Sequence, residues 1–598
     1  MHKLILFIKE FRIYKKEELL GAIASFSKKQ YIVFLAFLAI ALISTVIMLG
    51  KINAMFLVDV PVSGGTITEG IIGVPTLVNP VIALSDADKD LTSLVYSGLM
   101  RKTADGEFIP DLAESYTVTP DGITYTFIMK KGQKFHNGDD ITADDVIFTI
   151  EKIKDPTIKS PRRMGWEGVK VTKTDDYTVV FTLESSYISF LDNTTIGILP
   201  SKLWKNFNVN EFNLSPLNTK PVGSGPYKIK SVLKNKEGIP EEYKLERFNR
   251  FALGKPMIKY FNIISYSNER DLIDALFSHS ISQAGGISPE YVKEAEKEKY
   301  AVNTATLPRI FGIFFNSSKN KIFGDAEVVK AIDKAIDRQY IIDQVLEGYG
   351  APIHNPIPEK IIPSGSTELY TNKNIEEANL ILDKAGWTLG SDGIRMKGGT
   401  TTKATTKKVN GKLVKEPAKT TEATRLSFSL TTGDAPELKE TTLLIKEQLK
   451  KIGIEVDIQK VYETGQLNQV IRARDYDALL FGQLINYESD LYSYWHSSQR
   501  VDPGRNIAMY NNKKVDILLE SIQKILNSEE RNEKYEDIIK EFDANIPAIL
   551  IYSPKYLYLT SPRLNNMSLL NMTVPADRFL SVYNWSTDTD KVWKFFTK

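Results

Sequence analysis

Three apolar segments in the second half of the chain alternate with two helix patterns, and this order restricts the fold more than any other feature. The three strand segments are residues 425–432, 454–461 and 476–482. The two helix patterns between them are residues 436–452 and about 467–473. A βαβαβ order favours a parallel, doubly wound sheet with helices on its faces. Ligands of such sheets bind beyond the carboxyl ends of the strands. The residues that follow Gly482 are therefore the first place to look for a site.

Local capping signals predict further elements. Residues 124–130 alternate between apolar and polar types, as in a half-buried strand. Thr142 is a good N-cap for the helix that follows it. Asp325 is expected to begin one long amphipathic helix that continues to about Leu346. Asn374, with a glutamate three residues later, is expected to begin another helix.

Residues 31–50 form an uncharged apolar segment, about as long as a helix must be to cross a bilayer core. The basic residues before it are Lys3, Lys9, Arg12, Lys15, Lys16, Lys28 and Lys29. Only Lys51 follows directly, so the positive-inside rule predicts a single-pass anchor with a cytoplasmic N-terminus and an extracytoplasmic module. A signal peptide cleaved near Ala54 is the alternative, although its apolar core would be too long. A buried core helix is a third, less favoured reading.

Composition excludes several classes of function. The chain has 598 residues, enough for at least two lobes. Its net charge of +2 gives no electrostatic reason to expect nucleic-acid binding. It has no cysteine, which excludes disulfides, thiolate metal sites and a lipid-modified cysteine. The usual nucleotide, hydrolase and metalloprotease motifs are missing, and the five histidines are scattered. We therefore expect no cofactor, no metal site and no enzymatic activity.

Residues 397–424 are rich in threonine and lysine and contain few large apolar residues. Such a segment cannot bury enough surface to offset the entropy lost on ordering. We expect a flexible surface insertion, with a short hairpin at about residues 409–414. An arm that binds the cell wall or lipid is the alternative.

Residues 111–155, DLAESYTVTPDGITYTFIMKKGQKFHNGDDITADDVIFTIEKIKD, read as strand, turn, strand, polar loop and helix. This stretch resembles the signature region of the family 5 extracellular solute-binding proteins, the peptide and oligopeptide receptors of ABC importers. The likeness extends from about residue 66 to about residue 594. Further blocks that resemble the family follow in the expected order: residues 94–101, 221–230, 328–358, 375–387, 474–482 and 507–512.

The resemblance implies an α/β, two-lobed fold of the periplasmic-binding-protein type (type II, class C-like). The fold would carry an extra subdomain and one N-terminal transmembrane helix. In chain order, the expected parts are a cytoplasmic basic arm (1–30), the transmembrane anchor (31–50), a linker (51–65), lobe I (66–310) with the subdomain at about 79–200, lobe II (311–548) with the insertion, and a C-terminal segment (549–598) that returns to lobe I.

The resemblance also suggests a ligand-binding segment. In relatives, a strand end is followed by an Asp-Tyr pair, and the aspartate binds the α-amino group of a peptide. Here the corresponding residues are Asn486 and Tyr487. Replacing a charge-assisted hydrogen bond by a neutral one weakens binding by on the order of 1–2 kcal/mol, or about tenfold. Either Glu488 or Asp490 replaces the aspartate, or the ligand is not held by a free amino terminus.

Main-chain groups of Gly482 and Leu484 could still pair with an extended peptide. Val74 is the matching candidate on the opposite side of the cleft. An aromatic cluster that includes Trp495 either lines side-chain pockets, stacks on sugar rings or packs in a core. The predicted substrate-binding residues are thus Val74, Gly482, Leu484, Asn486, Tyr487, Glu488, Asp490 and Trp495.

These observations predict a membrane-anchored, monomeric receptor that binds peptides between its lobes and delivers them to an ABC permease in the same membrane. One alternative is a receptor for a non-peptide solute such as an oligosaccharide. Another is a membrane-anchored sensor or interaction protein, although residues 1–30 are too few for an output domain.

Overall fold

The computed structural model consists of two compact units, Ser63–Thr587 and Met1–Val62 with Asp588–Lys598. It describes residues 16–596 apart from residues 187–189, 358–373, 400–404, 410–411, 417–421, 459–460, 486–487, 524, 526 and 571.

The smaller unit contains a long apolar helix, α3 (Lys28–Phe56), which follows the short helix α2 (Lys16–Ala24). None of the α3 residues is buried, and their number and composition would allow the helix to cross a membrane. The helix leads directly into β1 (Leu57–Pro61), which pairs antiparallel with β26 (Thr589–Trp593). Residues 51–61, expected to belong to a linker, are therefore regular structure. The sequence did not indicate this because the partner strand lies near the other end of the chain.

The larger unit contains one 13-stranded sheet, and we use lobe I for the part of it with the strand order β25-β12-β2-β11-β10-β9 and lobe II for the part from β22 to β25. The strands of lobe I are β2 (Gly64–Ile72), β9 (Tyr227–Lys234), β10 (Pro240–Arg247), β11 (Ile258–Tyr266), β12 (Gln283–Gly285) and part of β25 (Ala548–Thr560). β2 pairs in parallel with both β11 and β12. The helices of this lobe include α4 (Asp86–Val95), α9 (Glu269–Phe277) and α10 (Val292–Lys297).

A separate four-stranded antiparallel sheet of order β5-β6-β8-β7 lies within residues 79–200, where the subdomain is predicted. Its elements are β5 (Ala113–Val118), β6 (Thr124–Met129), α5 (Ala143–Lys154), β7 (Val169–Asp175) and β8 (Thr178–Leu183). The predicted alternation is confirmed, because Tyr125, Phe127 and Met129 of β6 are buried. Thr142 precedes α5 as predicted, and its backbone N–H donates to Asp145 at 2.9 Å.

His136 joins this subdomain to the segment between α8 (Val209–Leu214) and β9. The backbone N–H of Gly223 donates to His136 Nδ1 at 3.4 Å, and His136 Nε2 lies 3.0 Å from the carbonyl oxygen of Gly225. Because a carbonyl only accepts, Nε2 carries the proton and the ring is neutral. Burial lowers the pKa of His136 to about 4. The histidine therefore has a structural role.

Lobe II contains the predicted βαβαβ unit. β21 (Ser427–Gly433) pairs in parallel with β22 (Glu455–Asp457), β23 (Val461–Tyr462) and β24 (Ala478–Leu484). The intervening helices are α14 (Pro436–Lys450) and α15 (Thr464–Ala473). The sheet continues with β14 (Arg309–Phe315) and β25, which both run antiparallel to their neighbours. The predicted parallel strands are thus confirmed, but they form only one part of a larger mixed sheet.

The single long helix predicted from Asp325 is wrong. The chain forms α11 (Ala326–Ala335) and α12 (Arg338–Val345), which are separated at Ile336 and Asp337. The Asp337 side chain accepts a hydrogen bond from the Tyr340 N–H, and so it caps a new helix instead of extending the first one. The Asp337 N–H donates to the side chain of Gln448, a long-range contact that no local pattern reveals.

Other local predictions in lobe II are confirmed. Asn374 accepts a hydrogen bond from the Glu377 N–H and caps α13 (Ile375–Lys384). A hairpin of β18 (Thr405–Val409) and β19 (Lys412–Glu416) interrupts the predicted insertion. The flexibility of that insertion stays a prediction.

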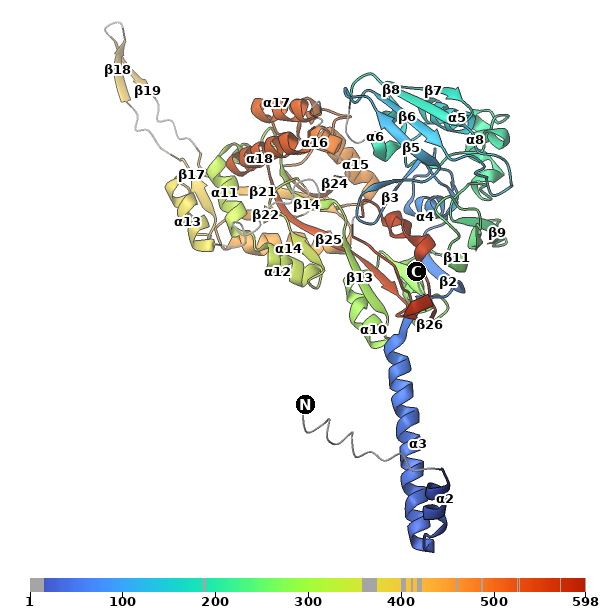
Figure 1. Cartoon of the computed structure of the whole chain (residues 1–598). Helices are drawn as coiled ribbons and strands as arrows, with labels where there is room; N and C mark the ends of the chain where they lie inside the picture. Colours follow the sequence, from blue (N-terminus) through green and yellow to red (C-terminus); the bar gives the residue numbers. More distant parts are fainter. Residues whose placement is uncertain are drawn as a thin grey trace. The chain divides into compact units, whose positions relative to one another are not determined.

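β25 connects the two lobes, as Figure 1 shows. Its first half pairs with β14 of lobe II, and its second half pairs with β12 and with β13 (Ala301–Thr306) of lobe I. Residues 549–552 pack in the lobe II core, whereas Leu557 and Leu559 pack in lobe I. The return to lobe I therefore takes place along this one strand.

A buried charge cluster fixes the C-terminal segment to lobe I. Arg578 donates from Nε to Glu69 at 2.7 Å and from Nη2 to Asp90 at 2.6 Å, and all three side chains are buried. Tyr558 and Gln283 also donate to Glu69. Burial raises the pKa of Asp90 to about 6 despite the neighbouring guanidinium. The cluster holds two carboxylates for one cation, so Arg578 is essential to it.

Candidate functional site

The candidate site lies at the carboxyl end of β24. One side of this strand pairs with β14 along its whole length, from Ala478↔Phe315 to Leu484↔Arg309. On its other side, β21 pairs only with Ala478 and Leu479. Among the residues that the structure describes, no strand pairs with this second side from Leu480 onward. The end of β24 therefore has an open edge.

The hydrogen-bond pattern shows which main-chain groups face the open edge. The Ile485 N–H donates to the carbonyl oxygen of Pro308 at 2.8 Å, so residues 485, 483 and 481 bond toward β14. The intervening residues must then direct their N–H and C=O groups to the opposite side. Two side-chain contacts agree with this direction. The carbonyl of Leu480 accepts a hydrogen bond from the Thr432 hydroxyl at 3.2 Å. The carbonyl of Leu484 accepts one from the Tyr494 hydroxyl at 3.1 Å.

Gly482 is thus central to the open edge. Its N–H and C=O, with the N–H of Leu484, have the direction and spacing to pair with an added strand. The two predicted main-chain residues therefore lie together and face the same way. Tyr494, a member of the aromatic cluster that follows the strand, supports this arrangement through its hydroxyl, a contact that the sequence did not indicate.

Of the other predicted residues near β24, Asn486 and Tyr487 lie outside the described residues. Glu488 and Asp490 belong to the first turn of α16 (Glu488–Trp495). The helix begins four residues after β24 ends, so both residues belong to the chain segment that follows the open edge.

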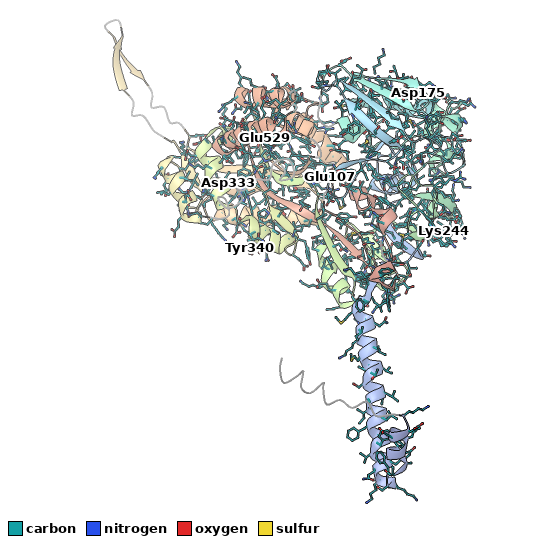
Figure 2. All side chains as sticks on the ribbon, in the orientation of Figure 1. Glu107, Asp175, Lys244, Asp333, Tyr340 and Glu529 are labelled. Carbon is teal, nitrogen blue, oxygen red and sulfur yellow. The ribbon has the colours of Figure 1, made fainter. Side chains whose placement is uncertain are left out.

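Trp495 is only 1% exposed and lies in the lobe II core. Its ring packs edge-on against Phe542, at 4.9 Å between centroids. It also lines a small cavity of about 50 Å³ together with Asp333 and Arg338. Asp333, labelled in Figure 2, accepts a hydrogen bond from Arg338 at 2.5 Å. This burial gives Trp495 a packing role, and its contact with a ligand stays a prediction.

Val74 lies in the loop after β2 and is partly buried. The N–H groups of Thr76 and Leu77 both donate to Asp88 Oδ1 at 2.8 Å, and the Tyr243 hydroxyl donates to the Pro75 carbonyl. The loop is therefore well fixed in lobe I. No described contact joins it to β24, so its role opposite Gly482 stays a prediction.

Comparison with known proteins identifies the family of the chain. A model of the bacterial extracellular solute-binding proteins, family 5, matches residues 107–503. The oligopeptide-binding protein AppA of Bacillus subtilis is 30% identical over 515 residues, which cover 83% of this chain and 87% of the relative. The chain belongs to family 5 of the bacterial extracellular solute-binding proteins. The predicted resemblance is confirmed.

Two solved structures of similar proteins support the two-lobed fold. AppA of B. subtilis in complex with a nonapeptide superposes with a TM-score of 0.65 at 28% identity, covering 88% of this chain and 100% of that one. NikZ of Campylobacter jejuni in complex with Ni(L-His) gives 0.67 at 25% identity, with coverage of 87% and 99%. Family 5 proteins are solute-binding receptors of ABC importers, and their binding module is extracytoplasmic.

One further residue at the end of β24, which sequence reasoning missed, is a candidate for the site. Gln483, between Gly482 and Leu484, is 3% exposed, and among the described residues neither its amide oxygen nor its amide nitrogen has a hydrogen-bond partner. Leaving such a group unsatisfied costs roughly 1–3 kcal/mol, so a bound ligand or water is the natural partner. The signal was a lone polar residue inside the apolar strand ALLFGQLI.

The groups that the structure describes at this site, the main chain of Gly482 and Leu484 and the Gln483 amide, can donate and accept hydrogen bonds. In the part of the chain that the structure describes, no group of three or more His, Asp or Glu residues could hold a metal ion.

Proposed function

We propose that this protein binds peptides at the open edge of β24 and delivers them to an ABC permease in the same membrane. The open edge around Gly482 carries the proposal, because strand addition satisfies the main-chain groups of any extended peptide whatever its sequence. A relative at 30% identity is named an oligopeptide-binding protein, which supports a peptide ligand. The protein acts as a monomeric receptor and does no chemistry on its ligand.

The second part of the proposal is that α3 remains as the membrane anchor. Its apolar core of residues 31–50 is about the length of a transmembrane helix and longer than that of a signal peptide. The basic residues before it and the single Lys51 after it favour a cytoplasmic N-terminus. Tethering keeps the receptor at a high local concentration near the permease.

A non-peptide solute is the second candidate ligand. The observation in its favour is Asn486, which has no charge to attract the α-amino group of a peptide. The structural relative NikZ was solved with Ni(L-His), so the fold accepts ligands other than long peptides.

Calorimetric titration of the full chain in nanodiscs tests the ligand class. We expect binding of unrelated peptides of equal length with similar affinity, since main-chain pairing dominates. Binding of oligosaccharides but not of peptides would reject the peptide proposal. Alkaline carbonate extraction and the intact mass of the cellular protein test the anchor: a protein that lacks residues 1–54 and is released from membranes would reject it.

A further inference from the structure

The C-terminal strand of the chain lies beside the outer end of α3. β1 follows α3 without a loop, and β26 pairs with it over five residues, from Leu57↔Trp593 to Pro61↔Thr589. The Val62 N–H adds a hydrogen bond to the carbonyl of Asp588 at 2.9 Å. The two segments that enter and leave the larger unit are thus held together in one short ladder.

Side chains strengthen this connection at the helix end. Trp593 Nε1 donates to Asn53 Oδ1 at 2.8 Å, between residues 540 positions apart in sequence. The rings of Trp593 and Phe56 lie 6.4 Å apart. Trp593 therefore contacts the last turns of α3 directly, in addition to the strand pairing.

Large apolar side chains gather at this place and remain exposed. Trp593 is 50% exposed, Phe595 89%, Phe56 56% and Met55 83%. Exposed apolar residues that lie next to one another are typical of contact surfaces. Tryptophan is enriched where membrane meets water, because its ring is apolar and its N–H is polar. Lys591 and Lys594, which are also exposed, suit anionic headgroups.

The position of Trp593 along α3 matches the depth of the lipid headgroup layer. At about 1.5 Å per residue, residues 31–50 span roughly 30 Å, the thickness of the hydrocarbon core. Asn53 and Phe56 then lie about 4–9 Å beyond the end of that core. The headgroup region on each side is of similar thickness, roughly 5–8 Å. Trp593, which contacts both residues, lies at the same depth.

We propose that residues 589–596 form a second membrane contact, the juxtamembrane clasp, with Trp593 and Phe595 in the outer headgroup layer. The inference rests on the proposed anchor, since only a retained α3 brings the clasp to the bilayer. The clasp would restrict movement at the point where the larger unit is attached. The sequence predicted only a linker at residues 51–65 and did not indicate this contact.

Site-directed spin labelling tests the clasp, and the lack of native cysteines makes single labels unambiguous. The full chain is placed in nanodiscs that contain anionic lipid, with a nitroxide at Phe595→Cys. Two further variants serve as references: Ile40→Cys within α3, and Val501→Cys, an exposed apolar position in the larger unit that is 75% exposed. The accessibility of each nitroxide to oxygen and to a water-soluble nickel complex reports its depth.

We expect the ratio of oxygen to nickel accessibility at residue 595 to be several-fold higher than at residue 501 and lower than at residue 40. A ratio equal to that at residue 501, with residue 40 in lipid, would overturn the clasp and leave the anchor intact. A water-like ratio at all three positions would overturn the anchor and the clasp together. Peptide titration of the same sample reports separately on the binding proposal.

Discussion

The ring of Phe311 lies across the position of Gly482 in the neighbouring strand. A Cβ atom at Gly482 would lie 2.7 Å from Cε1 of that ring, closer than side chains can approach. Phe311 is held in place because it stacks on Tyr552 at 5.4 Å between centroids. The missing side chain at Gly482 thus allows an aromatic ring to pack behind the open edge of β24.

Gly482→Ala should therefore damage both the core and the site. Overpacking of this kind lowers the free energy of unfolding by roughly 1–3 kcal/mol. Because the strand must shift to relieve the contact, peptide affinity should fall as well. Gly324→Ala is the matched control, since its Cβ would meet no atom within 4 Å. Unchanged affinity and thermal midpoint in Gly482→Ala would show that the open edge tolerates displacement.

Asn486→Asp tests the amine-binding position. A carboxylate there should raise the affinity for peptides with a free α-amino group by about tenfold. The affinity for the same peptides after N-acetylation should not increase. If Glu488 or Asp490 already binds the amine, Glu488→Gln or Asp490→Asn should instead lower the affinity for peptides with a free α-amino group and leave that for acetylated peptides unchanged. If each substitution changes the affinity for free and for acetylated peptides equally, neither position 486 nor Glu488 or Asp490 binds the α-amino group.

Arg578→Met should destabilise the protein strongly. The change leaves Glu69 and Asp90 as buried carboxylates without a counterion, and breaking a buried ion pair in this way costs about 3–5 kcal/mol. Chemical denaturation measures the difference. Arg270→Met is the control because its ion pair with Asp274 is exposed (74% and 61%), and it should change little. Similar losses in the two variants would contradict the role of the buried cluster.

The neutral ring of His136 predicts a specific pH dependence. Its pKa is lowered from 6.5 to about 4 by burial, so the folded protein binds this proton less tightly than the unfolded chain does. The stabilisation is therefore complete above pH 6.5 and is lost as the pH falls from 6.5 to 4. The loss should be roughly 1–3 kcal/mol and smaller in His136→Gln. If the free energy of unfolding of the unsubstituted protein and of His136→Gln falls in parallel between pH 6.5 and pH 4, His136 is not the group responsible.

The sequence predicted the elements whose patterns are local. The strands around α14 and the buried face of β6 follow directly from apolar periodicity. The break between α11 and α12 was missed, because an aspartate at position 337 suits both a solvated helix face and an N-cap. What decides between them is the contact with Gln448, which is distant in sequence.

The site was predicted less completely than the fold. The order of strands located the end of β24, and the spacing of Gly482 and Leu484 agrees with the direction of their main-chain groups. The aromatic cluster could not be interpreted from the sequence, because Trp495 in a core and Trp495 in a cleft have the same neighbours along the chain. The pairing of β1 with β26 depends on residues from opposite ends of the chain, and no local pattern indicates it.

The most direct test of peptide binding is native mass spectrometry of the full chain, purified gently in nanodiscs so that captured ligands remain bound. We predict a heterogeneous set of peptides that is released on partial unfolding and is reduced in Gly482→Ala. A single bound sugar or other solute, with no peptide detected and no binding of added peptides, would contradict the central claim.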